Sequence, residues 1–233
     1  MIDFHSHILP GVDDGSPSGE VSIAMLRAEG AQGITHVVAT PHFDAVGDDP
    51  RHFLARRDRA EAALREAMAP HGDLPQVLVG AEVAFFRGIS ESEYLPMLTI
   101  RGRSCILIEM PPAPWPEEYY RELEAIWEKR GIIPILAHID RYIGPFRTYG
   151  IPKRLARMMV YVQANGDFFL ERGRGNMALR MLRADQIHLL GSDCHNLTNR
   201  KPNLGPVLDK IRRHLGEDAL ERILEHSREI LEL

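Results

Sequence analysis

Met1-Ile-Asp-Phe-His5-Ser-His7 opens the chain as a short apolar run that ends in two histidines, and this arrangement recurs along the sequence. Seven such runs occupy residues 1–4, 34–40, 77–83, 104–109, 132–137, 160–164 and 187–192. Each run carries, or stops just before, a side chain of the kind that binds a metal ion or positions a phosphate. In a parallel β/α barrel the carboxyl ends of the strands meet on one face and hold the active site. The sequence therefore predicts a ring of parallel strands with its chemistry on one rim.

The segments between these runs have the spacing of amphipathic helices. They occupy residues 18–30, 49–69, 117–130, 152–159, 176–184 and 206–214, and a terminal helix is expected at 217–233. Strand and helix thus alternate, which is the pattern of βαβ units. With 233 residues, 44% of them hydrophobic, the chain can form one substantial core, so we expect a single α/β domain over residues 1–233.

Composition excludes several classes of protein. The formal net charge is -5 and no Lys/Arg-rich run occurs, which argues against a nucleic-acid partner. No apolar stretch approaches the ~20 residues of a membrane helix, and the N-terminus lacks the features of a signal peptide. We therefore expect a cytoplasmic protein without membrane insertion. The two cysteines, Cys105 and Cys194, provide neither a disulfide framework nor thiolate metal spacing.

Polar side chains at the ends of the runs are candidate metal ligands. His5 and His7 are two residues apart, so both imidazoles can face one ion in an extended backbone. Glu82 and Glu109 lie in otherwise apolar runs, where an uncompensated carboxylate costs several kcal/mol in desolvation. The candidate ligands are His5, His7, Asp14, His42, Glu82, Glu109, His138, Asp193 and His195.

Nine ligands are too many for one ion. Imidazole and carboxylate ligands without thiolate suit Mn²⁺, Fe²⁺, Zn²⁺ or Co²⁺, so we expect two or three catalytic divalent ions. The other histidines, at strand starts or in surface-like segments, are interpreted as ordinary: His36, His52, His71, His188, His214 and His226.

Five strings carry a resemblance to a known family: Asp3-Phe-His5-Ser-His7-Ile-Leu-Pro-Gly-Val-Asp-Asp14-Gly15, Ala39-Thr-Pro-His42, Gly80-Ala-Glu82, Leu136-Ala-His138-Ile-Asp-Arg141-Tyr142 and Gly191-Ser-Asp193-Cys-His195-Asn. Together they resemble the polymerase and histidinol phosphatase (PHP) superfamily. Within it, they are similar to the bacterial manganese-dependent protein tyrosine phosphatases of capsule and exopolysaccharide loci. The resemblance spans essentially the whole chain.

The resemblance implies a distorted seven-stranded β/α (TIM-like) barrel with a trinuclear metal site. It assigns one ion to His5, His7, Glu82 and Asp193, and makes Glu82 the bridge to a second ion that is also held by Glu109 and His138. Asp14, His42 and His195 would hold the third. The implied substrate is a phosphotyrosine protein, namely the tyrosine-rich tail of an autophosphorylated bacterial kinase that controls polysaccharide synthesis.

Clustered divalent ions make a hydroxide nucleophile from bound water and hold the phosphoryl oxygens during attack. Arg141 and Arg200 follow His138 and His195 closely, so we expect them to be catalytic, by stabilising charge on the phosphoryl oxygens. Cys194 and the Gln163-Ala-Asn165-Gly segment depart from the usual family strings, which bears on substrate preference.

Several alternatives stay open. A PHP-type small-molecule phosphatase, such as a histidinol phosphatase, would need the same ligands, and a non-catalytic regulatory module could keep its ions for stability alone. Cys194 and Arg200 have the C-x5-R spacing of cysteine-dependent phosphatases, although the loop between them lacks the glycines of a phosphate cradle. The aromatic residues in the Pro-rich segment 111–120 would either stack on the substrate or pack on the barrel. The sequence does not fix the oligomeric state.

Overall fold

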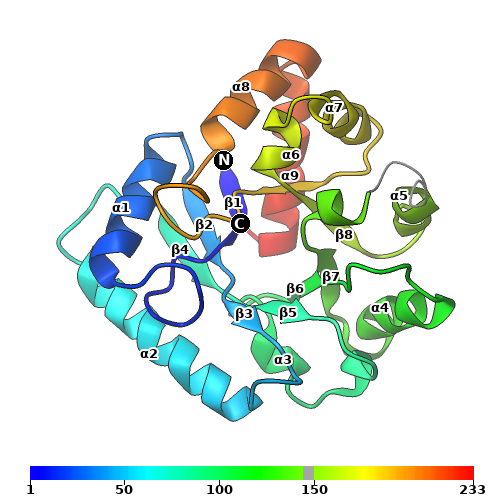
Figure 1. The fold of residues 1–233 in the computed structure, drawn as a ribbon, viewed down its shortest axis with the longest axis horizontal. Coiled ribbons are helices and arrows are strands. Elements are labelled where there is room, and N and C mark those ends of the chain that lie inside the picture. The colour runs from blue at the N-terminus through cyan, green and yellow to red at the C-terminus, as the bar shows by residue number, and fades with distance from the viewer. Residues whose placement is uncertain (144–149) are drawn as a thin grey trace.

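The computed structural model describes residues 1–143 and 150–233 as parallel strands surrounded by helices (Figure 1). The strands are β1 (Ile2–Ser6), β2 (His36–Ala39), β3 (His42–Phe43), β4 (Gln76–Val79), β5 (Glu82–Ala84), β6 (Cys105–Glu109), β7 (Ile133–Leu136), β8 (Tyr161–Asn165) and β9 (Leu189–Gly191). The helices are α1 (Gly19–Gly30), α2 (Pro50–Met68), α3 (Leu95–Leu98), α4 (Glu117–Arg130), α5 (Gly150–Leu155), α6 (Gly166–Leu170), α7 (Gly175–Arg183), α8 (Leu204–Leu215) and α9 (Glu217–Leu231), with 3₁₀ turns at Ile89–Glu91 and Ile139–Tyr142.

The strands form a three-stranded sheet, in the order β1-β2-β4, and a curled six-stranded half-barrel, in the order β3-β5-β6-β7-β8-β9. All of the paired strands are parallel. The predicted parallel α/β architecture is therefore confirmed, but the strands are divided between two sheets and not gathered into one seven-stranded sheet.

The division arises because two of the predicted runs are interrupted. Pro41 separates β2 from β3, and a proline has no N–H to donate to a neighbouring strand. The paired run breaks at Gly80 and Ala81, where a Cβ on Gly80 would come within 3.1 Å of the Ile100 side chain. Backbone hydrogen bonds cross the break, from Gly80 N to Ala39 O at 2.8 Å and from Glu82 N to Pro41 O at 3.0 Å.

A second irregularity lies between the first and last strands. β1 and β9 share one isolated parallel bridge, between Ser6 and Cys194, beyond the end of β9. The His7 N–H donates to Cys194 O at 2.9 Å, and the Asp193 N–H donates to His5 O at 2.8 Å. The chain segments that follow β1 and β9 are thus held side by side at the same end of the strands.

The helix boundaries follow ordinary start and stop signals. Asp49 caps α2, since its Oδ1 accepts from the N–H groups of Arg51 and His52 at 2.9 and 3.0 Å, and Pro50 occupies the first position. Gly131 ends α4 in left-handed backbone with φ 64°. The helices expected from the sequence are present, although α5 begins two residues before the predicted 152–159 segment and ends at Leu155, and α3 and α6 were not anticipated.

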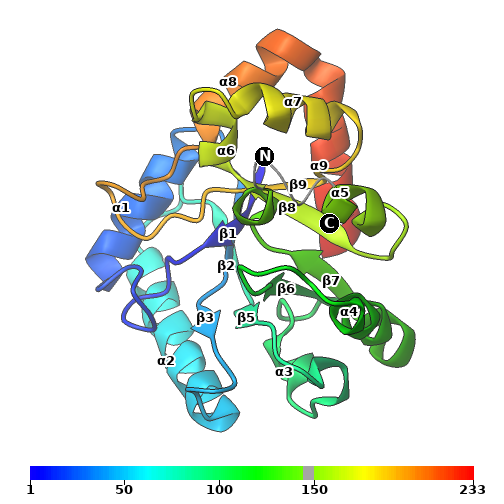
Figure 2. The ribbon, with the colours of Figure 1, turned by 45° about the vertical axis from the view of Figure 1, so that its right-hand side comes forward.

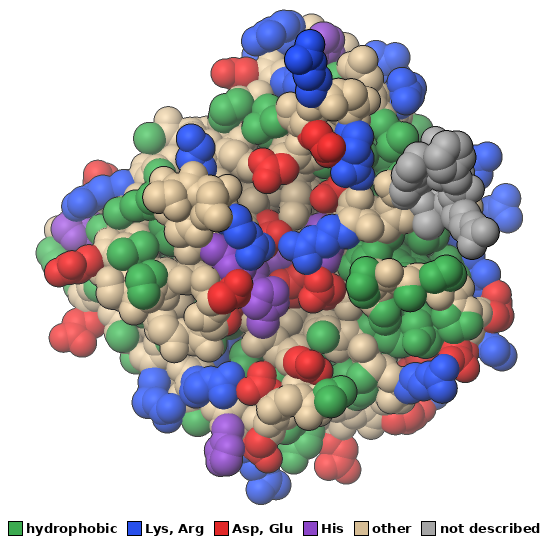
Figure 3. All heavy atoms as spheres, in the orientation of Figure 1, with side chains coloured by type: hydrophobic (Ala, Val, Ile, Leu, Met, Phe, Trp, Pro, Cys, Tyr) green, Lys and Arg blue, Asp and Glu red, His purple; other side chains and the backbone are tan. Residues whose placement is uncertain are grey.

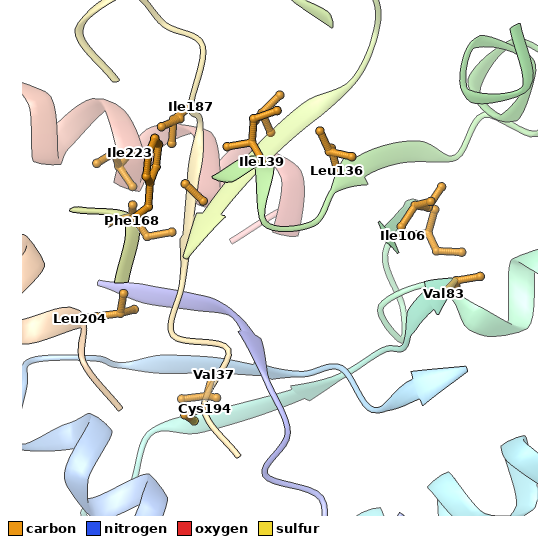
Figure 4. Close-up of a cluster of buried hydrophobic side chains, with 14 of the residues drawn as sticks. Val37, Val83, Ile106, Leu136, Ile139, Phe168, Ile187, Cys194, Leu204 and Ile223 are labelled. Carbon is orange, nitrogen blue, oxygen red and sulfur yellow. The ribbon is translucent and has the colours of Figure 1, made fainter. Parts of the chain in front are cut away.

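The strand pattern separates two apolar clusters, because successive side chains of a strand point to opposite faces. Val37, Ile106 and Leu136 belong to the outer cluster beneath the helices (Figure 4), while Val38, Leu107 and Ile135 belong to the inner one. Figure 2 shows α9 beside the strands, and its Ile230 and Leu231 join the inner cluster. Among residues 1–143 and 150–233, no helix combines the length and the apolar composition needed to cross a membrane.

Candidate metal centre

The nine predicted ligands lie at one end of the parallel strands: seven are at or after the carboxyl ends of β1, β6, β7 and β9, and His42 and Glu82 begin the short strands β3 and β5. His5 lies near the end of β1 and His7 just beyond it, Glu109 ends β6, and His138 follows β7. His42 and Glu82 lie directly opposite each other as paired residues of β3 and β5. Asp14 comes from the loop after β1, and Asp193 and His195 follow β9. Figure 3 shows histidine, acidic and basic side chains gathered in the middle of this face of the molecule.

Glu82 is the centre of the cluster. Its Oε2 lies 3.1 Å from His5 Nε2, 3.4 Å from His7 Nε2 and 3.0 Å from His42 Nδ1. Its Oε1 lies 2.8 Å from His138 Nε2. One carboxylate, only 1% exposed, therefore contacts four imidazoles that come from three strands or their ends: β1, β3 and β7.

The remaining predicted ligands surround this centre. Asp193 Oδ1 is 3.6 Å from His5 Nε2 and 3.4 Å from His7 Nε2. Asp14 Oδ1 lies 3.3 Å from His195 Nε2 and 3.5 Å from His42 Nε2. Glu109 Oε1 lies 3.4 Å from His138 Nε2. Three overlapping groups have their ligand atoms within 4.8 Å of one another: His7, Asp14, His42 and His195; His5, His7 and Asp193; and His42, Glu82 and Glu109.

The donor atoms fit divalent cations. His5 Nε2 and His7 Nε2 face each other at 3.1 Å, although two neutral ring nitrogens cannot both present lone pairs there without a proton or a cation between them. Glu82 Oε2 and His195 Nε2 are buried and have no hydrogen-bond partner among the described residues. Buried polar atoms normally have such a partner, so these atoms point to a ligand. Imidazole nitrogens and carboxylate oxygens suit Mn²⁺, Fe²⁺, Zn²⁺ or Co²⁺.

The electrostatics of the cluster favour ionised carboxylates. Burial opposes ionisation of Glu82, but the charge of His5 and the close approach of His138 and His42 outweigh burial and hold its pKa well below the usual value. The pKa of Asp193 is likewise lowered despite burial, chiefly by His5 and His7. Burial lowers the pKa of His138, but hydrogen bonds to Glu109 and Glu82 raise it to about 9. Burial and the charges of His7 and Arg200 lower the pKa of His195 to about 4.

Two of the predicted ligands have strained backbone. His138 has φ 32° and Asp193 has φ 52°, both in the left-handed region that L-residues rarely adopt. Each such residue costs about 1–3 kcal/mol, and this kind of strain is typical of functional sites. Both side chains reach the cluster from these turns, His138 to Glu82 and Asp193 to His7.

The two predicted catalytic arginines also lie at the centre. Arg141 NH1 donates to Glu109 Oε1 and its NH2 to Asp193 Oδ2, both at 2.9 Å. Arg200 NH2 donates to Asp193 Oδ1 at 2.8 Å, and its NH1 lies 3.7 Å from Asp14 Oδ2. Both guanidinium groups are partly exposed, at 41% and 35%, so each has donors left for a ligand from solvent.

Three residues at the centre were not predicted as functional. Asp13 Oδ2 accepts from His7 Nδ1 at 2.7 Å; burial raises the pKa of Asp13, but His7 lowers it to about 2. The sequence favoured Asp14 of this acidic pair and gave Asp13 no role. Gln163 and Asn165 on β8 contact three of the predicted ligands, and only their place at a strand end hinted at this.

Cys194 is not a candidate nucleophile. Its side chain is fully buried, and its Sγ lies 3.7 Å from Glu29 Oε1 of α1, away from the histidines. Burial raises the pKa of its thiol well above the usual value. A cysteine-dependent phosphatase needs an accessible thiolate, so the C-x5-R interpretation is wrong.

The aromatic residues of segment 111–120 pack on the rim of the strands. Trp115 Nε1 donates to Pro111 O at 3.1 Å, and its ring lies 5.0 Å from that of Tyr142. Tyr142 in turn lies 5.7 Å from the His138 ring. Tyr119 pairs with Phe85 at 4.5 Å. These aromatic residues pack on the strands, and Trp115 and Tyr119 are half-buried beside the centre.

Comparison with known proteins adds independent findings. Residues 1–232 match the family described as capsular polysaccharide synthesis, CpsB/CapC. The chain is 29% identical to tyrosine-protein phosphatase YwqE of Bacillus subtilis, over 99% of this chain and 91% of that protein. It is also 29% identical to tyrosine-protein phosphatase CpsB of Streptococcus pneumoniae, over 99% of this chain and 98% of that protein.

Two solved structures have the same fold as this chain. A chain from the crystal structures of YwqE and CpsB, described as unique metal-dependent tyrosine phosphatases, superposes with a TM-score of 0.87 at 25% identity, covering 100% of this chain and 94% of that chain. The histidinol phosphate phosphatase of Lactococcus lactis shares the fold, with a TM-score of 0.57 at 15% identity over 94% of this chain and 93% of that chain.

Proposed function

Because the chain belongs to the capsular polysaccharide synthesis family CpsB/CapC, we propose that it is a metal-dependent phosphatase that hydrolyses phosphotyrosine in a protein. The observation that carries this proposal is the placement of Glu82, a buried carboxylate in contact with four imidazoles at the carboxyl ends of the strands. A binding module would have no need to collect so many desolvated ligands, each of which costs stability when unpaired.

The ligand atoms support three ion positions. We assign His5, His7, Glu82 and Asp193 to one ion, and Glu109 and His138 to a second that shares Glu82. Asp14, His42 and His195 are assigned to the third, in keeping with their proximity. Mn²⁺ is the ion that we propose. When bound, divalent ions at this site would lower the pKa of a bound water and would bind and orient the phosphoryl oxygens.

The protein's own residues would bind and orient the phosphate. Arg141 and Arg200 approach Asp193 from two sides and keep further N–H donors for the equatorial phosphoryl oxygens. Tyrosine has a pKa near ~10, so a phenolate leaves readily and needs less protonation than an alkoxide would. A dedicated general acid is therefore less important for an aryl phosphate than for an alkyl phosphate.

We also propose that the two sheets act as one distorted seven-stranded barrel. In this description β2 with β3, and β4 with β5, are each one interrupted strand, and the hydrogen bonds across Pro41 and Gly80 support their continuity. The Ser6–Cys194 bridge would then close the ring between the first and last strands.

The proposed substrate is the phosphorylated tail of a bacterial tyrosine kinase that controls capsular or exopolysaccharide synthesis, and the proposed location is the cytoplasm. The family description supports the link to capsular polysaccharide, and the names of the relatives as tyrosine-protein phosphatases support a phosphotyrosine substrate.

The test is turnover with defined metal content. Protein stripped with a chelator should be inactive, and added Mn²⁺ should restore hydrolysis of a phosphotyrosyl peptide, with two or three ions per chain by elemental analysis. Histidinol phosphate serves as the competing substrate. A large preference for histidinol phosphate would replace the protein substrate with a small molecule, and no turnover at any Mn²⁺ concentration would leave a non-catalytic module.

A further inference from the structure

Strand β8 carries none of the nine proposed ligands, yet two of its side chains reach the metal centre. Gln163 is fully buried and Asn165 is 8% exposed. They are two residues apart on a strand, so both point to the same face. Gln163 Nε2 donates to Asn165 Oδ1 at 3.0 Å, which joins the two amides directly.

One backbone group determines which atoms of the two amides donate and which accept. The N–H of His138 donates to Gln163 Oε1 at 2.6 Å, and a backbone N–H can only donate. Gln163 must therefore turn its oxygen to His138 and its NH₂ group to Asn165. Asn165 then has to present its oxygen to Gln163, which leaves its Nδ2 to donate to Asp193 Oδ2 at 2.9 Å.

The same oxygen of Gln163 faces His5. Gln163 Oε1 lies 3.4 Å from His5 Nδ1, and because this oxygen accepts only, the His5 proton belongs on Nδ1. In the neutral form of His5, which binds metals, Nε2 then carries the lone pair, and it faces Glu82 and His7. An imidazole ligates a metal in this form, with its other nitrogen held by an outer partner.

The outer partner of His5 differs from those of its neighbours. His7 donates from Nδ1 to the Asp13 carboxylate at 2.7 Å, and His195 Nδ1 is 3.0 Å from the backbone oxygen of Asp193. Only His5, of these three, is held by a side-chain amide, and that amide also contacts His138 and, through Asn165, Asp193.

We propose that Gln163 and Asn165 form an amide relay of positioning residues, which orients His5, the His138 backbone and Asp193 as one unit for ion binding. The proposal rests on the proposed metal centre. His138 and Asp193 are the two ligand residues with left-handed backbone, so the relay is attached at the points where the local chain is strained.

The test measures Mn²⁺ binding by isothermal titration calorimetry, not activity alone. Gln163→Met keeps the side-chain length but removes the whole relay, and Asn165→Leu removes only the arm to Asp193. Outer partners of metal ligands are worth about 10–100-fold in affinity, so we expect a loss in this range for Gln163→Met and a smaller one for Asn165→Leu. The double variant should lose no more than Gln163→Met alone, because the arm to Asp193 depends on Gln163.

A matched control is Gln32→Met. Gln32 also joins distant backbone groups, since its Nε2 donates to Pro202 O at 3.1 Å and its Oε1 accepts from Gly205 N at 2.7 Å, but it does not touch the centre. This variant should lower the melting temperature and leave Mn²⁺ affinity unchanged. Gln163→Glu, which keeps the acceptor for His138 and His5, should retain more affinity than Gln163→Met, and it carries the test if Gln163→Met does not fold.

The outcomes separate the relay from the proposed function. If the wild type binds Mn²⁺ and hydrolyses phosphotyrosine while Gln163→Met binds Mn²⁺ equally well, the relay is wrong and the function stands. An equal loss of affinity in Gln32→Met would also refute a specific relay. If the wild type binds no Mn²⁺, both proposals fail.

Discussion

Two groups of acidic and metal-ligating side chains lie a short distance apart and differ in protonation and in access from solvent. One is the metal centre around Glu82. The other, which we call the acid cluster, consists of Asp3, Glu29 and Cys194, all fully buried. In the acid cluster, as in each group of the metal centre, potential ligand atoms lie within 4.8 Å of one another.

The acid cluster is neutralised mainly by protons and hydrogen bonds. Asp3 accepts from His5 N at 3.0 Å, Ser192 N at 2.9 Å and Ser192 Oγ at 2.6 Å. Burial and the nearby Asp3 raise the pKa of Glu29 well above its usual value, which favours the neutral, protonated form of this side chain. These bonds hold the start of β1 against the end of β9, where the two strands share only one bridge.

The metal centre differs because its lone pairs face one another and face solvent. Asp14 is 65% exposed and His42 is 38% exposed, which gives ions and substrate a way in. Its imidazole nitrogens and carboxylate oxygens converge on shared positions, where a cation can replace the protons that they would otherwise share. Residue types alone therefore do not define a metal site. Donor atoms without a hydrogen-bond partner, together with access from solvent, do.

The largest expected effect comes from Glu82→Gln, which removes the shared carboxylate. Turnover of a phosphotyrosyl peptide with saturating Mn²⁺ should fall by more than the ~100-fold that outer partners are worth. Glu29→Gln is the matched change in the acid cluster and should leave turnover within about threefold, because an amide resembles a neutral acid in shape and charge. Equal losses in the two variants would contradict the distinction between the clusters.

The next effect is stabilisation by the ion. Mn²⁺ at about 100 times its dissociation constant should stabilise the wild type by about 2.7 kcal/mol, or roughly 5–10 °C in melting temperature. Differential scanning calorimetry with and without Mn²⁺ measures this shift. Glu29→Gln should keep the shift and Glu82→Gln should lose most of it; a metal site at the acid cluster would give the opposite ranking.

A smaller effect concerns pH and the acid cluster. The pKa of Glu29 is raised in the folded state, so the folded protein holds a proton that the unfolded chain releases above about pH 4.5. Stability from this group is complete below that pH and is lost as pH rises, with a slope of at most about 1.4 kcal/mol per pH unit. Glu29→Gln should remove the loss, so its stability relative to the wild type should increase from pH 5 upward in urea unfolding. If the stabilities of the wild type and of Glu29→Gln changed in parallel with pH, Glu29 would be ionised in the folded protein.

The smallest effect is expected for Cys194→Ser. The side chain points at Glu29 and away from the histidines, and a hydroxyl can donate to Glu29 in place of the thiol. Turnover should stay within about twofold of the wild type, and stability should change by about 1 kcal/mol. Loss of turnover with retained Mn²⁺ binding would support a catalytic role for Cys194, as the C-x5-R spacing suggested.

The sequence predicted those parts of the centre that have a local signature. Glu82 and Glu109 interrupt apolar runs, and His138, Asp193 and His195 follow such runs, so the strand-end pattern located them. The seven runs also indicated the parallel strands, because buried parallel strands are nearly continuous apolar segments.

What escaped prediction depends on contacts between distant segments. The choice between Asp13 and Asp14 is decided by which carboxylate reaches His7 Nδ1 after the loop folds back. The role of Gln163 depends on the neighbouring strand placing the His138 N–H opposite its oxygen. The split at Pro41 and Gly80 was visible as residue types, but its effect on sheet continuity appears only when the two runs pair.

The left-handed backbone at His138 and Asp193 has a practical consequence for engineering. Glycine adopts this conformation without penalty, so replacing either residue with glycine would relieve strain while deleting a ligand. Asp193, however, also accepts hydrogen bonds from Arg141, Arg200 and Asn165, so the relief of strain is set against the loss of these bonds. A directed-evolution campaign for thermostability should therefore keep Mn²⁺ present, because bound ions add to the stability that both side chains contribute.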